Sequence, residues 1–201
     1  MPPSLWIVVL IKDLTTAKSR LASALEPQAR RRLAEMTAAR ALDAAVALAP
    51  TLAVCGSVEA GELARIRGAA LVVEPSPSGQ NPAATRGLDE VAQRGAEAAL
   101  LLSSDLPLVD EAALCRLLAH TEIPGSIVVA APADGRQGTN ALYLRPPRNF
   151  TLHFGEASLP KFAEEARLRG RQFIIHDDPS LGLDLDEPSD LAAWRRLGPT
   201  G

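Results

Sequence analysis

The sequence predicts an α/β fold, with a parallel sheet between two layers of helices. Short and nearly continuous apolar runs, which are typical of strands buried on both faces, alternate with amphipathic stretches. This β-α-β order sets parallel strands side by side and places their helices on the two faces of the sheet. A chain of 201 residues without an internal repeat or a linker is expected to form one domain, residues 1–201.

The first half of the chain provides three of the strands. Residues 5–11 form an apolar first strand, and residues 12–21 form a polar loop that enters a short helix. Glu26 and Pro27 open a long Ala-rich helix that ends near Pro50, because Pro is tolerated in the first turn of a helix and not in its interior. The pattern then predicts a strand at 51–55, a helix at 59–67, a strand at 69–73, and a helix that follows 80–82 and runs to about 95.

The second half continues the alternation. The pattern predicts a strand at 98–102, a helix at 112–120, strands at 126–131 and 141–144, a helix at 159–169, a strand at 172–176 and a last helix at 189–197. Because open α/β sheets bind ligands beyond the carboxyl ends of their strands, the polar stretches between these elements are the candidate site segments.

Asp105 stands at the end of the apolar run 98–102, where Pro107 stops the strand. It therefore lies at the ligand-binding edge of the predicted sheet. A carboxylate in this position either caps the following helix or holds a metal ion, and the residue by itself leaves both interpretations open.

A second acidic pair, Asp184 and Asp186, follows another short apolar stretch. Side chains alternate along an extended segment, so these two carboxylates point to one side while Leu183 and Leu185 face the core. The pair favours a metal site shared with Asp105, and the alternative is a capping arrangement ahead of the last helix.

The loop after the first strand carries Lys12, Lys18 and Arg20. The chain has 18 Arg and only three Lys, and two of those Lys lie in this loop, where a compact charge suits phosphate oxygens. The loop lacks the glycines of a Walker-A or dinucleotide loop, which argues against both classes. The alternative is that these cations are ordinary solvated charges.

Composition excludes several further classes. A net charge of −3 gives no electrostatic footprint for nucleic acid, and the apolar run 5–11 is too short for a signal peptide or a membrane span. Cys55 and Cys115 lack metal-ligand spacing and lie in apolar stretches, so we expect buried free thiols in a reducing compartment. These features predict a cytoplasmic protein.

Six motifs follow one another in an order that is similar to a known family. They are Lys12-(x5)-Lys18-Ser19-Arg20-Leu21, Gly79-Gln80-Asn81, Asp105-Leu106-Pro107-Leu108, Gly138-Thr139-Asn140-Ala141-Leu142, Phe154-Gly155-(x2)-Ser158 and Leu183-Asp184-Leu185-Asp186-Glu187-Pro188-Ser189-Asp190-Leu191. Together they resemble the guanylyltransferases of deazaflavin coenzyme F-420 biosynthesis, which join the GMP of GTP to phosphoenolpyruvate or 2-phospho-L-lactate. The resemblance covers nearly the whole chain. It implies a single-domain, three-layer α/β/α nucleotidyltransferase fold that is Rossmann-like, with a mostly parallel mixed sheet.

The resemblance also implies roles for individual residues. It places one or two Mg²⁺ ions at Asp105, Asp184 and Asp186, phosphoenolpyruvate at Thr139, Gly155 and Ser158, and the co-substrate GTP at Lys12, Lys18, Ser19, Arg20 and Asn81. Asp105, Lys12 and Lys18 would carry catalysis. From the residues alone, Asn81 and Ser158 are equally explained as helix caps and Gly155 as a turn residue. The chain departs from the family pattern at two positions, with Asp13 in place of Pro and Gln80 in place of Leu.

The implied reaction is attack of the phosphate of phosphoenolpyruvate on the α-phosphorus of GTP. The second pKa of a phosphomonoester is about 6, so the nucleophile is ionised and no general base is required. Alternative acceptors are 2-phospho-L-lactate and 3-phospho-D-glycerate, and alternative classes are a molybdenum-cofactor or sugar-phosphate nucleotidyltransferase and an inactive nucleotide sensor. The resemblance implies a functional link to the enzyme that transfers the product to the deazaflavin precursor. Charge and hydropathy predict no nucleic-acid or membrane partner, and a homodimer is left open.

Overall fold

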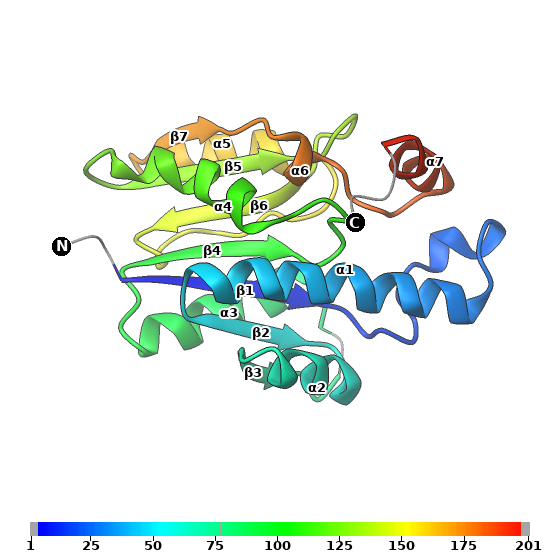
Figure 1. The fold of residues 1–201 in the computed structure, drawn as a ribbon. Coiled ribbons are helices and arrows are strands. Elements are labelled where there is room, and N and C mark those ends of the chain that lie inside the picture. The colour runs from blue at the N-terminus through cyan, green and yellow to red at the C-terminus, as the bar shows by residue number, and fades with distance from the viewer. Residues whose placement is uncertain (1–3, 77, 198–201) are drawn as a thin grey trace.

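A seven-stranded sheet in the order β3-β2-β1-β4-β6-β5-β7 forms the middle layer of the molecule (Figure 1). The computed structural model describes residues 4–76 and 78–197, so the ends of the predicted domain and residue 77 lie outside the described residues. The strands are β1 (Leu5–Ile11), β2 (Thr51–Cys55), β3 (Ala70–Val73), β4 (Ala98–Ser103), β5 (Ile127–Pro132), β6 (Thr139–Arg145) and β7 (Gln172–Ile175).

Strand β6 runs against both of its neighbours. It pairs antiparallel with β4 and β5, while the other neighbouring strands pair parallel, and its arrow in Figure 1 points the opposite way. The amino end of β6 therefore lies at the same sheet edge as the carboxyl ends of β1 to β5. The predicted mixed sheet is confirmed.

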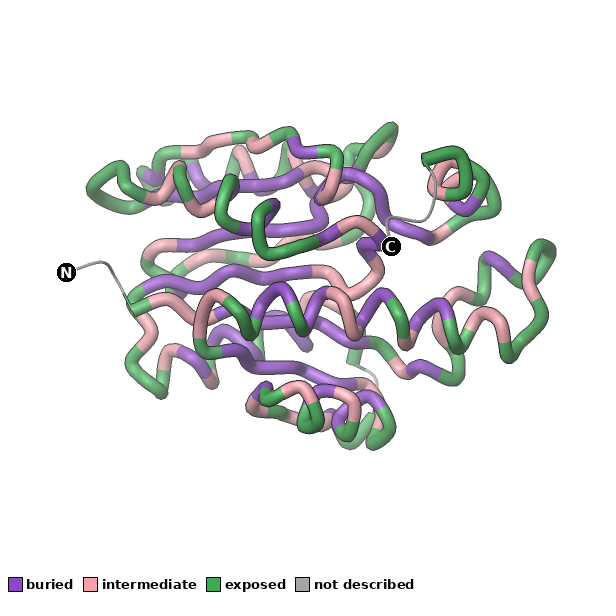
Figure 2. Tube along the Cα trace, viewed as in Figure 1, coloured by how far each residue is buried: buried purple, intermediate pink, exposed green. Residues whose placement is uncertain are grey.

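Helices cover both faces of the sheet. One face carries α1 (Pro27–Leu48), α2 (Val58–Ile66), α4 (Glu111–Leu118) and α6 (Pro179–Gly182), and the other carries α3 (Gln80–Gln93) and α5 (Ser158–Leu168). Alternate residues of β1 divide between the two cores: Ile7 and Val9 face α1, and Val8 faces α3. The central strands β1, β2, β4, β5 and β6 are consequently buried along most of their length (Figure 2), which is why their sequences read as continuous apolar runs. The three-layer α/β/α prediction is confirmed.

A third, small core lies beyond the ligand-binding edge of the sheet. Leu21, Leu33, Leu185 and Leu191 pack together there and join the 3₁₀ helix η1 (Ser19–Ser23), the start of α1 and the helix α7 (Pro188–Leu197). This cluster holds the segment with the second acidic pair against the loop that follows β1.

Two details differ from the sequence prediction. The short helix α6 lies between the strand and the last helix predicted for this part of the chain, and the side chain of Asp178 caps it by accepting a hydrogen bond from Ser180 N. The expectation that both thiols are buried is wrong for Cys115, which is exposed on α4, whereas Cys55 is buried and its burial raises its pKa to about 12.

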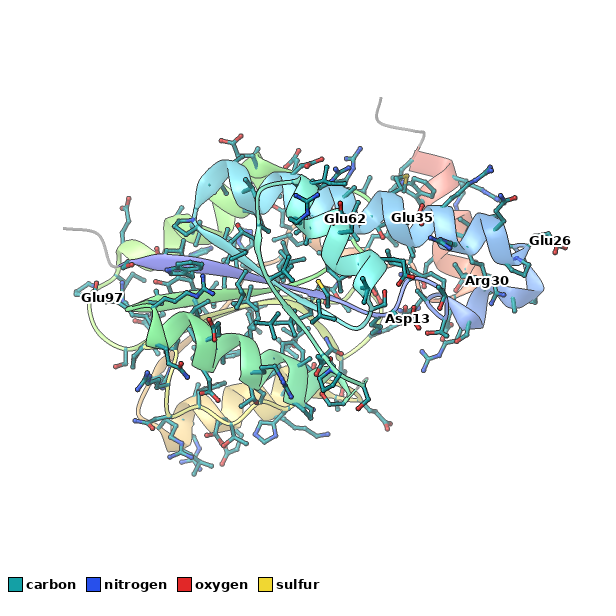
Figure 3. The ribbon with its side chains drawn as sticks, turned by 90° about the horizontal axis from the view of Figure 1, so that it is seen from below. Asp13, Glu26, Arg30, Glu35, Glu62 and Glu97 are labelled. Carbon is teal, nitrogen blue, oxygen red and sulfur yellow. The ribbon has the colours of Figure 1, made fainter. Side chains whose placement is uncertain are left out.

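Within the described ranges, no helix combines the length and the apolar character that crossing a membrane requires. Figure 3 shows Asp13, in the loop after β1, and Glu97, just before β4, toward opposite ends of the sheet. The Asp13 end is the end where the candidate site lies.

Candidate active site

A cavity of about 1000 Å³ lies at the edge of the sheet where β1 to β5 end and β6 begins. Six strands contribute wall residues: Lys12 after β1, Gly56 after β2, Glu74 after β3, Asp105 after β4, Ala133 after β5 and Thr139 at the start of β6. The reversal of β6 is what brings Thr139 to this edge. The cavity lies where the sequence predicts ligands to bind.

Three carboxylates meet at one side of this cavity. Asp105 follows β4, while Asp184 and Asp186 lie between α6 and α7, and one oxygen from each lies within 4.8 Å of the others. The backbone N–H of Leu185 donates to the carbonyl oxygen of Asp105 at 3.1 Å, and the Leu185 side chain is fully buried. The alternation predicted for this segment is therefore present, with the acids turned toward the cavity and the leucine toward the core.

These carboxylates suit a hard divalent cation. Burial raises the pKa of Asp184 to about 6, with the charges of Asp105 and Asp186 acting in the same direction and that of Arg136 opposing them. Mutual repulsion of this kind is relieved by a divalent ion, and carboxylate oxygens are the ligands that Mg²⁺ prefers. In donor type and spacing the three residues fit the ion that the resemblance implies.

Lys18 points into the carboxylate cluster. Its Nζ lies 3.4 Å from Asp105 Oδ2 and 3.9 Å from Asp186 Oδ1, and its side chain is only 5% exposed. Its backbone is in the left-handed region, with φ at 60°, directly before η1. Arg20 is more exposed, with Nη1 4.0 Å from Asp186 Oδ2. The interpretation of Lys18 as a solvated surface charge is therefore wrong.

Arg136, in the connection between β5 and β6, is a residue of the cluster that the sequence analysis missed. Its Nη1 donates to Asp184 at 2.9 Å and its Nη2 to Asp190 at 2.7 Å. The carboxylate of Asp190 in turn accepts the backbone N–H groups of Asp186 and Glu187, at 2.9 and 2.7 Å. In the sequence, the feature that could have indicated this role is the position of Arg136 as a cation in a polar loop, just before the Gly138-Thr139 motif.

The residues that the resemblance assigns to the acceptor lie on the β6 side. Ser158, the first residue of α5, is fully buried and donates its hydroxyl to that of Thr139 at 3.0 Å. Thr139 and Gly155 line the cavity, and Gly155 has a φ of 120°, a conformation that favours glycine. Ser158 lies behind Thr139 and orients its hydroxyl.

Asn81 neither caps a helix nor lines the cavity wall among the described residues. Helix α3 begins one residue earlier, and the Asn81 amide makes two hydrogen bonds with Phe154, donating to its O at 3.0 Å and accepting from its N at 2.7 Å. The cap interpretation is wrong. Asn81 fixes the loop that carries Gly155.

Of the eleven residues predicted for the site, most come together at the cavity. Those on its wall are Lys12, Lys18, Arg20, Asp105, Thr139, Gly155, Asp184 and Asp186. Ser19, Asn81 and Ser158 are off the wall, and Ser19 is exposed in η1.

Asp13, which stands where the family pattern has Pro, contacts Thr15. The N–H and the hydroxyl of Thr15 both donate to Asp13 Oδ1 at 2.8 Å, and these hydrogen bonds lower the pKa of Asp13.

Comparison with known proteins gives a consistent result. The family model "Guanylyl transferase CofC like" matches residues 5–194. A phosphoenolpyruvate guanylyltransferase from Rubrobacter xylanophilus is 36% identical over 197 residues, which cover 97% of this chain and 95% of that protein.

Two other relatives are named for different acceptors. A 3-phospho-D-glycerate guanylyltransferase from Phenylobacterium zucineum is 34% identical, and the match covers 96% of this chain and 90% of that protein. A 2-phospho-L-lactate guanylyltransferase from Methanothermobacter thermautotrophicus is 31% identical, and the match covers 92% of this chain and 81% of that protein. The crystal structure of a protein of the nucleotide-diphospho-sugar transferase type from Desulfovibrio desulfuricans G20 matches with a TM-score of 0.81 at 15% identity, covering 99% of this chain and 89% of that one. The structural match supports the fold.

Proposed function

The chain belongs to the guanylyl transferase CofC-like family, and we propose that it transfers GMP from GTP to the phosphate of phosphoenolpyruvate. The products are enolpyruvyl-diphospho-guanosine and pyrophosphate. The observation that carries this proposal is the convergence of Asp105, Asp184, Asp186 and Lys18 beside Thr139 in one cavity. The whole chain would act as a single nucleotidyltransferase domain.

The main barrier to this reaction is electrostatic, because a phosphate dianion must approach a triphosphate. Lys12 and Arg20 on the cavity wall would bind phosphate oxygens of GTP, and Lys18 lies beside the carboxylates where the α-phosphate must be held. Thr139 and the backbone at Gly155 would hold the acceptor on the β6 side, with Ser158 orienting Thr139. Ser19 is off the wall and would act on the nucleotide only indirectly, and Asn81 would act through the loop that carries Gly155.

Mg²⁺, held by Asp105, Asp184 and Asp186, would supply positive charge to the triphosphate oxygens when bound. No general base is needed. His120 and His176, which contact each other near β7, are not among the described residues of the cavity wall. The carboxylates and Lys18 would then fix the α-phosphorus in line with the incoming oxygen.

The acceptor is the least constrained part of the proposal. Phosphoenolpyruvate is favoured because a relative named for it is 36% identical to this chain, against 34% and 31% for the relatives named for 3-phospho-D-glycerate and 2-phospho-L-lactate. The three acceptors differ by one double bond or one hydroxyl group, and such differences are discriminated by pocket shape. The product would pass to the enzyme that attaches it to the deazaflavin precursor of coenzyme F-420.

The test is pyrophosphate release by the purified protein with GTP and Mg²⁺, in parallel with each of the three acceptors. The enzyme that consumes the product is included, because the guanylylated intermediate is expected to be labile. Release with phosphoenolpyruvate that is lost on chelation is the expected result. Turnover only with ATP or CTP and a sugar phosphate would contradict the proposal, and bound GTP without turnover would indicate a nucleotide sensor.

A further inference from the structure

Glu74 is a buried acidic residue that the mechanism above does not use. It directly follows β3 and lines the cavity, and its side chain is only 6% exposed. The hydroxyl of Ser78 donates to its Oε1, and Arg86 Nε lies 4.0 Å from the same oxygen. Across residues 4–76 and 78–197, Oε2 accepts no hydrogen bond. A buried carboxylate with a free oxygen on a cavity wall is suited to binding a ligand that has N–H groups.

The sheet places Glu74 far from the carboxylate cluster. Glu74 follows β3 and Asp105 follows β4, and the order β3-β2-β1-β4 separates these strands by three steps. At about 4.8 Å for each step, the two strands are about 14 Å apart. This distance is comparable to the length of a nucleoside monophosphate with its phosphate at the cluster and its base at Glu74.

The acceptor residues lie on the other side of the cluster. Thr139 begins β6, the strand that pairs with β4 on the side away from β1. An acceptor at Thr139 and a phosphate at Asp105 leave the β1 to β3 part of the cavity for the nucleoside. On the proposed function, the base would lie at the Glu74 end.

Beside Glu74 the wall is made of small and apolar groups. Leu10, Val54 and Ala83 belong to one apolar cluster and expose a small part of their surface to the cavity, and Gly56 and Gly79 add no side chain. A flat aromatic ring can pack on such a surface while a carboxylate contacts its edge. This combination of an apolar floor and an acidic edge is what a purine with edge donors requires.

We infer that Glu74 selects guanine. Guanine presents two adjacent donors, N1–H and the 2-amino group, and the two oxygens of a carboxylate can accept both. Oε1 has a second lone pair and can accept from the base while it accepts from Ser78. Adenine presents an acceptor at N1 and a C–H at C2, so the same carboxylate repels it. The inference rests on the proposed function and adds the group that distinguishes GTP from ATP.

Glu74→Gln tests this inference with GTP and inosine triphosphate, which lacks only the 2-amino group. The kcat/KM of the wild-type protein is expected to be about 10- to 100-fold higher for GTP, the range for a hydrogen bond to a charged group. In Glu74→Gln the preference is expected to fall to about 3-fold or less, because the amide can accept only one of the two donors. Glu97→Gln, at the opposite end of the sheet, is the matched control and is expected to keep the wild-type ratio.

The outcomes separate the two proposals. Wild-type protein without GTP-dependent pyrophosphate release would contradict the proposed function itself. An active wild-type protein whose Glu74→Gln variant keeps the full preference for GTP over inosine triphosphate would overturn the role of Glu74 alone. If the variant does not fold, the affinities of GTP and inosine triphosphate for the wild-type protein are compared by calorimetry. Equal affinities would show that the protein does not recognise the 2-amino group, and would overturn the role of Glu74.

Discussion

The backbone N–H of Leu185 donates to the carbonyl oxygen of Asp105 at 3.1 Å, and this bond joins two acidic segments that are about eighty residues apart in the sequence. Leu185 is at the same time a member of the small core with Leu21 and Leu191. The spacing of the carboxylates is therefore set by main-chain geometry and apolar packing rather than by the acids themselves. A substitution of an acid side chain should leave this framework in place.

Asp105→Asn is expected to fold normally and to reduce turnover by about 10³-fold, because a charge at the proposed metal site is removed while the backbone bond to Leu185 remains. Pyrophosphate release measures the loss, and Mn²⁺ titration followed by electron paramagnetic resonance measures the ion directly. Asp110→Asn is the control, because it removes a carboxylate charge while the asparagine side-chain oxygen can still accept from Ala113 N and cap α4, so turnover should stay near that of the wild-type protein. Near-normal turnover in Asp105→Asn would remove this residue from the mechanism.

Arg136→Met is expected to destabilise the metal-free protein by about 1–3 kcal/mol, because Asp184 and Asp190 lose their guanidinium partner. The loss should be smaller when Mg²⁺ is bound, since the ion takes over part of the charge compensation at Asp184. Chemical unfolding in the presence of a chelator and in the presence of Mg²⁺ gives the comparison. Arg65→Met, which breaks an exposed pair with Glu62, is the control. An equal loss in both conditions would show that Arg136 has only a structural role.

Asn81→Ala is expected to raise the KM for the acceptor more than the KM for GTP. The substitution leaves the N and O of Phe154 without their partner and releases the loop that carries Gly155. Steady-state kinetics with each substrate varied in turn provide the two constants. If instead only the KM for GTP rises, Asn81 serves the nucleotide as the family resemblance implies.

Glu165→Gln gives a prediction for pH. Burial acts to raise the pKa of Glu165, but hydrogen bonds from Arg169 and from Thr151 outweigh it and lower the pKa to about 2. A lowered pKa in the folded state stabilises the protein above about pH 4.5, and the contribution is lost as the pH falls toward 2. At neutral pH the variant should be up to about 3 kcal/mol less stable than the wild-type protein.

That difference should shrink between about pH 4.5 and 2, which urea unfolding at a series of pH values can follow. Glu164→Gln, whose exposed partner is Arg167, is the control and should have a small effect at every pH. A constant difference across the whole range would indicate lost packing rather than lost ionisation.

The sequence predicted the central elements well because β1, β2, β4, β5 and β6 are buried on both faces. The apolar run 98–102 was predicted as a buried strand, and Pro27 marked the start of α1 to the residue. The direction of β6 was not readable, since an apolar run of four residues has the same pattern in either direction. It follows from pairing with β4 and β5, which is a long-range property.

The site was predictable where the chemistry lies in a short motif, and less so where it depends on distant partners. Asp105, Asp184 and Asp186 stood out as acids after apolar runs. The roles of Arg136 and Glu74 depend on which residues the fold brings next to them, Asp184 in one case and the apolar floor in the other. Nothing in the residues flanking Glu74 distinguishes it from an ordinary loop acid.

The reversed direction of β6 also has an evolutionary consequence. The residues that we assign to the nucleotide, Lys12, Lys18, Arg20 and Glu74, all precede Asp105 in the chain, whereas Thr139 and Gly155, which we assign to the acceptor, follow it. The two substrates are thus assigned to separate halves of one gene product, which meet at the carboxylates. Acceptor preference can diversify through the second half while the guanine nucleotide half is inherited unchanged, and the relatives that share guanylyl transfer but differ in their three-carbon acid fit this division.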